Sequence, residues 1–227
     1  MIMPIITLRR KRVIVDVDTQ RHFFADSGIV CVRNHRQVLA NILRVVKWAR
    51  LGNIRMISTV QIFPSEYPYC NSRITDIEGQ KKINYTFRRR RASFDAADST
   101  DLLPEILELY EQVIFQKRCF DPFKEPRADR MLSELDADEF ILIGALREGA
   151  VKATALGLLS RHKNVTVLVD ATGSYNKTAG EVALRVMSER GVRLINTHTF
   201  LGSSWVQLAK SDWFGQPGLG VFRRAEH

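Results

Sequence analysis

Two carboxylates and one lysine are the side chains best placed to do chemistry. Asp16 and Asp18 end the β-branched run "KRVIVDVD" (residues 11–18), and Lys117 ends the short apolar run "VIFQK" (113–117). Strand alternation puts the two acids on the same side, where an acid facing a crevice can accept a proton. Spacing alone favours a turn-capping Asp and a solvated Lys. Lys117 becomes a candidate functional residue if it reaches Asp18, because the pair could then shift the pKa of a neighbouring group.

A strand-to-helix corner at residues 143–155, "IGALREGAVKATA", is a second candidate. A nucleophile at a helix start gains from the helix dipole and the free backbone N–H groups, and a cysteine there would have a lowered pKa. The turn itself offers no Ser, Cys, Thr or His, and only Gly149 and Ala150 stand there. Alanine is a small helix former, so the corner by itself predicts no chemistry.

The elements that must position these residues alternate along the chain. β-branched runs predict strands at residues 11–18, 54–60, 113–117, 139–146, 165–170 and 192–196. Helical spacing of apolar residues predicts helices at 34–53, 101–111, 126–135, 148–163 and 179–191. This alternation predicts an α/β fold, a three-layer α/β/α sandwich with a mostly parallel central sheet. In such sheets ligands bind beyond the carboxyl ends of the strands, where all the candidate positions fall.

A single domain fits the length of 227 residues, and 45% hydrophobic residues are enough for a core. Residues 62–100 show no clean period and are predicted to be a long loop or insertion that carries a basic run. Residues 203–227 are predicted to be an aromatic C-terminal tail. Its aromatic residues are expected to pack on this domain or on a neighbouring subunit: Trp205, Trp213 and Phe214.

The formal net charge of +9 sits in two short runs, residues 9–12 and 81–91. Together they hold ten basic residues and no acid, and the rest of the chain has 24 basic against 25 acidic residues. A solvated stretch in a long loop is the favoured interpretation of the second run, so nucleic-acid binding is not the leading expectation. Tyr85 and Phe87 beside the arginines keep that alternative open.

The three cysteines, Cys31, Cys70 and Cys119, form no disulfide framework and no C-x-x-C pair. Free thiols predict a cytoplasmic protein. The N-terminus has apolar residues before its charges, the reverse of a signal peptide, and no apolar run approaches the ~20 residues of a membrane span. Neither Cys31 nor Cys119 lies at a predicted helix start, so both are interpreted as ordinary, partly buried thiols.

Four stretches resemble, in their order and spacing, the isochorismatase-like cysteine hydrolase superfamily: "VDVDTQRHFF", "FQKRCFDPF", "IGALREGAVKATALGLL" and "NVTVLVDATGSYNK". That superfamily includes isochorismatases, nicotinamidases and related amidohydrolases, and the resemblance covers about residues 11–202. It implies that Asp18 and Lys117 match the catalytic Asp and Lys, and that Ala150 occupies the position of the nucleophilic Cys. In the family the Asp acts as base toward the thiol, and backbone N–H groups form an oxyanion hole.

The resemblance also implies a pocket or oxyanion site and a cis peptide between Ala145 and Leu146. Where the family usually has small or polar residues this chain has Leu146 and Arg147, and Arg147 is expected at the pocket rim. The segment "STVQIFPSEYPYC" lacks the Asp and His ligands of nicotinamidases, so no metal or other cofactor is expected. A homo-oligomer is implied by the family. The implied pocket positions are Gln20, Phe23, Ala145, Leu146, Arg147 and Gly149.

Three hypotheses about function follow. The first is a family member that has lost thiol chemistry and keeps a small-molecule pocket or serves as a scaffold. The second is an active cysteine hydrolase, acting on a C–N amide or a vinyl ether, whose Cys was replaced by Ala150. The third is a binder of nucleic acid or an acidic partner through residues 81–91, which predicts steep salt dependence.

Overall fold

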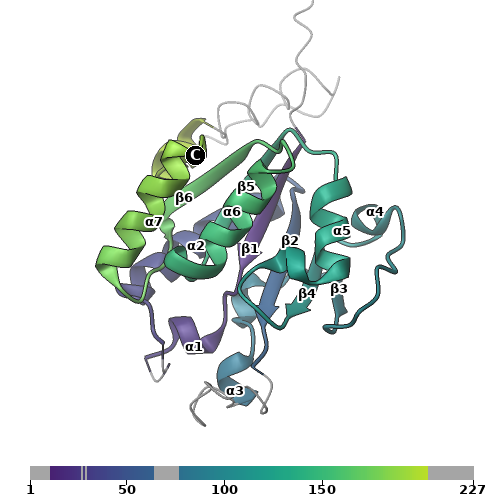
Figure 1. The fold of residues 1–227 in the computed structure, drawn as a ribbon, viewed down its shortest axis with the longest axis horizontal. Coiled ribbons are helices and arrows are strands. Elements are labelled where there is room, and N and C mark those ends of the chain that lie inside the picture. The colour runs from purple at the N-terminus through teal and green to yellow at the C-terminus, as the bar shows by residue number, and fades with distance from the viewer. Residues whose placement is uncertain (1–10, 27, 29, 64–76, 204–227) are drawn as a thin grey trace, which may run out of the picture.

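The computed structural model describes residues 11–26, 28, 30–63 and 77–203. These residues form a seven-stranded parallel sheet in the order β3-β4-β2-β1-β5-β6-β7 (Figure 1). The predicted mostly parallel sheet is therefore confirmed. The strands are β1 (Arg12–Val17), β2 (Arg55–Gln61), β3 (Arg91–Phe94), β4 (Gln112–Lys117), β5 (Glu139–Gly144), β6 (Val165–Thr172) and β7 (Arg193–Ile195).

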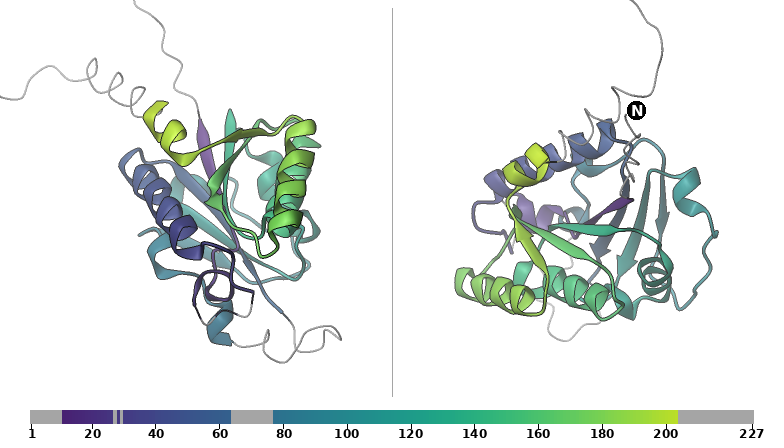
Figure 2. Two further views of the ribbon diagram at one scale, coloured as in Figure 1. Left: turned by 90° about the vertical axis from the view of Figure 1, so that its left-hand side faces the viewer. Right: turned by 90° about the horizontal axis from the view of Figure 1, so that it is seen from above.

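Helices cover both faces of the sheet, as the predicted sandwich requires (Figure 2). One face carries α2 (His35–Leu51) and the helical residues 197–203. The other face carries α5 (Pro126–Glu134), α6 (Lys152–Leu159) and α7 (Lys177–Glu189). Short helical segments complete the described chain: α1 (Arg21–Phe24), α3 (Ile77–Gln80), η1 (Asn84–Thr86), α4 (Ile106–Leu109), η2 (Pro122–Lys124) and the π-helical turn η3 (Arg147–Val151).

The central strand β1 is buried on both sides. Val13, Val15 and Val17 pack into the core beneath α5, α6 and α7, while Ile14 packs into the core beneath α2. A strand covered by helices on both faces has no solvent side, which is why its sequence is a nearly continuous β-branched run. The polar exception in this strand is Asp16, which is fully buried.

The chain changes direction across the sheet at β1. It passes from β1 to β2, β3 and β4 on one side, then returns to β5 on the other side of β1. Val17 pairs with Gly144 where β1 and β5 end. Such a switch point opens a crevice beyond the carboxyl ends of the strands. Asp18 and the residue 143–155 corner both lie at this place.

The structure differs from the sequence prediction between residues 62 and 111. The region predicted as a long loop contains α3, η1 and the edge strand β3. Strand β3 has alternating exposed and half-buried residues and pairs with its neighbour on one edge, so it lacks the strong apolar run of the central strands. The predicted 101–111 helix shortens to α4, which begins after Pro104.

Several sequence predictions fall outside the described residues. They concern Cys70, the first two residues of the 9–12 basic run, and the aromatic tail with Trp205, Trp213 and Phe214. Within the part of the chain that the structure describes, no helix combines the length and the apolar character needed to cross a membrane.

Candidate active site at the carboxyl ends of the strands

The structure brings Lys117, at the end of β4, to Asp18, just after β1. Lys117 Nζ lies 2.6 Å from Asp18 Oδ2, and both residues are buried, with 0% and 1% of their surface exposed. The same ammonium group donates to Gln61 Oε1 over 2.7 Å and to the Cys119 carbonyl over 3.1 Å. A lysine has three N–H donors, so protein acceptors occupy all of them.

The second oxygen of the Asp18 carboxylate is also bonded. Thr59 Oγ1 donates to Asp18 Oδ1 over 2.7 Å, and the Asp18 backbone N–H lies 3.2 Å from the Thr59 carbonyl. Asp18 has a φ of 48°, a left-handed conformation that breaks the strand geometry of β1. The carboxylate is thus held by β2 and β4, the two strands that follow on one side of β1.

Asp16 takes a different partner, which corrects the expectation that Asp16 and Asp18 act from one side. Lys82 Nζ forms an ion pair with Asp16 Oδ2, and Ser58 Oγ donates to the same oxygen over 3.0 Å. The Lys82 side chain is 2% exposed. Alternation does not extend to Asp18, because its left-handed backbone lies past the strand. Part of the 81–91 run is therefore structural, against the prediction of a solvated stretch.

Ala150 lies in η3, directly after the turn that ends β5. Gly144 at the end of β5 has a φ of +119°. The peptide bond between Ala145 and Leu146 is cis, as the resemblance implies. Ala150 is 0% exposed. The methyl group packs in the core cluster that also holds Val17 and Phe115. The position to which the resemblance assigns the nucleophile is therefore a packed apolar site.

Arg147 points inward and does not form a charged rim. Its guanidinium donates to the Val169 and Thr172 carbonyls, each over 2.6 Å, and to Thr172 Oγ1 over 3.1 Å. Burial lowers the pKa of the Arg147 guanidinium, and Glu181 acts in the opposite direction. The side chain is 14% exposed. Arg147 thus ties the corner to the end of β6, which corrects the expectation from sequence.

Glu148 fixes the loop that follows β6. Its carboxylate accepts from Ser174 Oγ over 2.8 Å and from the backbone N–H groups of Tyr175 and Asn176 over 3.0 and 2.9 Å. Gly149 lies against the half-exposed Phe120 ring, since a Cβ built there would lie 3.6 Å from that ring. Neighbouring side chains therefore close the corner from two directions.

The remaining predicted pocket residues also have structural contacts. Gln20 is fully buried, and its amide donates to the carbonyls of Gln61 and Gln80 over 2.8 and 2.7 Å. Phe23, Ala145 and Leu146 pack in the core beneath α2. The structure gathers the predicted residues at the β1–β5 switch point and uses these side chains for packing and internal hydrogen bonds.

The contacts of the two described cysteines, Cys31 and Cys119, do not mark either as a nucleophile. Burial raises the pKa of the Cys31 thiol, and the Asp26 carboxylate raises it further, which disfavours the reactive thiolate. Cys119 contributes its backbone carbonyl to Lys117, while its Sγ lies 3.4 Å from the Asp121 carbonyl. Both thiols are compatible with the ordinary interpretation given from sequence.

Four residues that hold the site together were not predicted from the sequence. Thr59 and Gln61 complete the Asp18–Lys117 network, Lys82 pairs with Asp16, and Glu148 holds the loop after β6. Thr59 and Gln61 could have been predicted as site residues, because both are polar and lie at or just after the end of the predicted 54–60 strand. Lys82 carries none, since the lysine directly before it has the same local sequence signal and is exposed.

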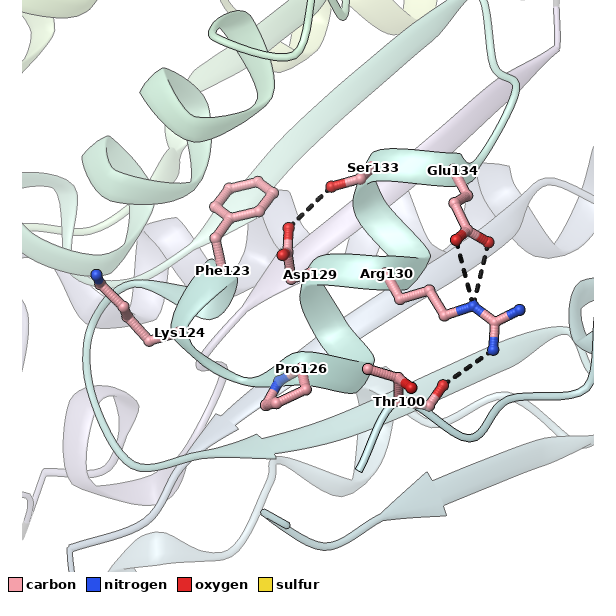
Figure 3. Close-up of a pocket in the computed structure, with 8 residues that line it drawn as sticks. All are labelled: Thr100, Phe123, Lys124, Pro126, Asp129, Arg130, Ser133 and Glu134. Atoms are coloured by element: carbon pink, nitrogen blue, oxygen red, sulfur yellow. Dashed lines mark hydrogen bonds and ion pairs between the residues drawn. The ribbon is translucent and has the colours of Figure 1, made fainter. Parts of the chain in front are cut away.

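Two cavities in the structure lie away from this site. The larger, about 600 Å³, is an open hollow beside η2 and α5 (Figure 3). Its lining residues are Thr100, Phe123, Lys124, Pro126, Asp129, Arg130, Ser133 and Glu134. The second, about 340 Å³, lies between residues 102–108 and the end of α5. Neither is lined by Asp18, Lys117 or Ala150.

The described residues contain no candidate metal site. No group of three or more His, Cys, Asp or Glu side chains there is arranged to hold a metal ion.

Comparisons with known proteins identify the family and the fold. Residues 12–199 match the isochorismatase domain family. No protein of curated function matches the chain in sequence. Among solved structures, an isochorismatase-like hydrolase from Alkaliphilus metalliredigens is 18% identical with a TM-score of 0.64, and the match covers 85% of this chain and 96% of that one.

Two further structures have the same fold. Pyrazinamidase of Pyrococcus horikoshii, solved in complex with zinc, is 18% identical with a TM-score of 0.63, over 82% of this chain and 99% of that one. MAR1 ribonuclease from Caenorhabditis elegans is 19% identical with a TM-score of 0.57, over 96% and 97%. At these identities the similarity to solved structures shows the fold alone. The domain match extends from β1 past β7, and the chain belongs to the isochorismatase family.

Proposed function

We propose that this chain is a non-catalytic member of the isochorismatase family, in which the residues of a hydrolase site hold the fold together. The observation that carries the proposal is the closed network around Lys117. All three N–H donors of its ammonium group bond to Asp18, Gln61 and the Cys119 carbonyl, next to a corner whose nucleophile position is Ala150.

The chemistry of acyl transfer supports this proposal. A thiol hydrolase forms a covalent bond between its sulfur and the substrate, then releases the product by attack of water. The Ala150 methyl group has no lone pair to make that bond. Direct attack by water would need Asp18 as a general base with an accessible oxygen. Its two oxygens accept from Thr59 and Lys117, and the residue is 1% exposed.

The alternative is an active cysteine hydrolase whose nucleophile was replaced by Ala150. The observation that favours it is the survival of the Asp18–Lys117 pair at the strand ends that adjoin the corner. The two proposals differ in the natural codon at position 150. Any codon other than Cys removes the alternative.

Turnover by the protein with Ala150 tests the proposal directly. We expect the purified protein to hydrolyse pyrazinamide, nicotinamide and isochorismate no faster than buffer, because position 150 carries no thiol and Asp18 is not an accessible base. Product formation is measured by chromatography over hours at high protein concentration. Turnover above the buffer rate that disappears in an Asp18→Asn variant, shown to be folded by circular dichroism, would contradict the proposal.

A further inference from the structure

Two long segments of the sequence contain no acidic residue. Residues 27–65 hold six basic residues and residues 79–94 hold another six, which is 12 of the 34 lysines and arginines and none of the 25 acids. The structure joins the two segments at the end of α2. Arg50 Nη2 donates to the carbonyls of Tyr85 and Phe87, each over 2.9 Å. The fold thus places the 81–91 basic run beside a second segment that has basic residues and no acid.

Helix α2 presents a basic outer face along its length. Its apolar residues, including Val38, Ile42 and Val45, are buried against the sheet. The basic residues that α2 and the turn before it expose are Arg33, Arg36, Arg44, Lys47 and Arg50. At 1.5 Å per residue the helical part of this row, from Arg36 to Arg50, is about 21 Å long. The helix itself contains no Asp or Glu that could neutralise the row.

The positive charge of this face is only partly compensated. Burial lowers the pKa of Arg88; the Glu111 carboxylate opposes this, and the nearby charges of Arg50 and Arg55 lower it further. The contacts agree with this: Arg88 Nη1 donates to the Ile54 carbonyl over 3.1 Å, and Arg50 Nη2 donates to the carbonyl of Phe87, the residue before Arg88, over 2.9 Å.

Counterions within the fold are few on this face. Asp26 pairs with Arg36, and Glu111 lies 3.8 Å from Arg90. Within the described chain, no ion pair joins a carboxylate to the side chains of the other exposed cations of this face, which are Arg33, Arg44, Lys47, Arg50, Arg89 and Arg91.

The chemistry of the face selects the kind of partner. A membrane-binding amphipathic helix inserts an apolar side, and the apolar side of α2 is already buried in the core. Phosphate groups match the guanidinium and ammonium row. Tyr85, 68% exposed in η1 and four residues before Arg89 in the chain, offers a ring for base stacking. Stacking of this kind needs unpaired bases.

We propose that the face formed by α2 and residues 84–91 binds single-stranded nucleic acid. Arg44, Lys47 and Arg89 contact backbone phosphates, and Tyr85 stacks on a base. The buried members of the basic run, Lys82 and Arg88, position this surface and make no contact with the ligand. The site lies apart from the Asp18–Lys117 network, so this proposal does not depend on whether the chain hydrolyses anything.

Fluorescence anisotropy with labelled RNA of about 16 nucleotides, near the upper site size of single-strand binders, tests the proposal. The variant Arg44→Glu/Lys47→Glu/Arg89→Glu is expected to bind at least about tenfold more weakly. The slope of log K against log salt should fall in magnitude by about 2, since each single-strand phosphate contact contributes about 0.7. Tyr85→Ala should weaken binding about fivefold or more at unchanged slope, and Tyr85→Phe should restore it.

A matched control variant tests whether the loss of binding comes from this face or from the change in net charge alone. The variant Lys177→Glu/Arg185→Glu/Arg190→Glu changes exposed residues on and beside α7, on the opposite side of the sheet, by the same charge (Figure 2). It should retain most of the affinity. Equal losses in the two triple variants would overturn the proposal, as would tighter binding of a duplex of the same sequence. Binding to anionic lipid vesicles without binding to RNA would overturn it as well.

Discussion

Replacing Lys117 by methionine is expected to lower the free energy of unfolding by about 3–5 kcal/mol. The variant leaves the Asp18 carboxylate buried, 1% exposed, with Thr59 as its remaining side-chain donor. An uncompensated buried charge is costly, because the protein interior cannot replace the lost hydration. Urea unfolding followed by circular dichroism measures the change. A loss below about 1 kcal/mol, the size of a surface pair, would mean that the network does not hold the strand ends together.

Two further variants isolate the charge effect. Asp18→Asn/Lys117→Met removes both charges and should recover part of the loss, because the double variant leaves no ion unpaired. Lys11→Met breaks an exposed pair, in which Lys11 Nζ lies 3.2 Å from Asp136 Oδ2, and should change the stability little. If Lys11→Met and Lys117→Met have the same effect, burial of the pair is not what matters.

Gly144→Ala is expected to cost about 3 kcal/mol or more, or to prevent folding, because it combines two mechanisms. The residue has a φ of +119°, which a side chain disfavours, and a Cβ there would lie 1.8 Å from the Val17 carbonyl oxygen. That oxygen accepts the Ala145 N–H over 2.8 Å. The added methyl group must therefore push apart β1 and β5 at the point where the candidate site is built. Thermal unfolding measures the effect.

Gly191→Ala is the matched control for this prediction. Gly191 also has a positive φ, +100°, but a Cβ there would meet nothing within 4 Å. Its variant should show the backbone strain alone, about 1 kcal/mol. Equal losses at the two positions would show that the approach of β1 to the corner does not constrain residue 144.

The sequence predicts the architecture well because the central strands are buried on both sides. β1, β2 and β5 are rich in β-branched or apolar residues, and α2 has a regular apolar stripe ending at Gly52. These patterns reflect local geometry and burial, which one sequence records. The pairing of Lys117 with Asp18 could be predicted, because the carboxyl ends of parallel strands meet at one edge of the sheet and the family resemblance names both residues.

The directions in which individual side chains point could not be predicted from the sequence in the same way. The left-handed backbone of Asp18 separates it from Asp16, although alternation predicts a shared side. Arg147 turns inward because the Val169 and Thr172 carbonyls need donors at the end of β6. Lys82 is buried and its neighbour Lys81 is exposed, although their local sequence signals are alike. These outcomes depend on contacts between residues far apart in the chain.

Alkylation of the thiol introduced by Ala150→Cys tests the central claim most directly, because it needs no knowledge of a substrate. Native protein is treated with iodoacetamide at neutral pH, and peptide mapping separates position 150 from Cys31, Cys70 and Cys119. We predict that position 150 is labelled only as fast as the protein unfolds, since Ala150 is 0% exposed and Asp18 is held by Lys117 and Thr59. Rapid labelling at position 150 that Asp18→Asn slows would contradict the account, because Asp18 would then be free to take the proton of a catalytic thiol.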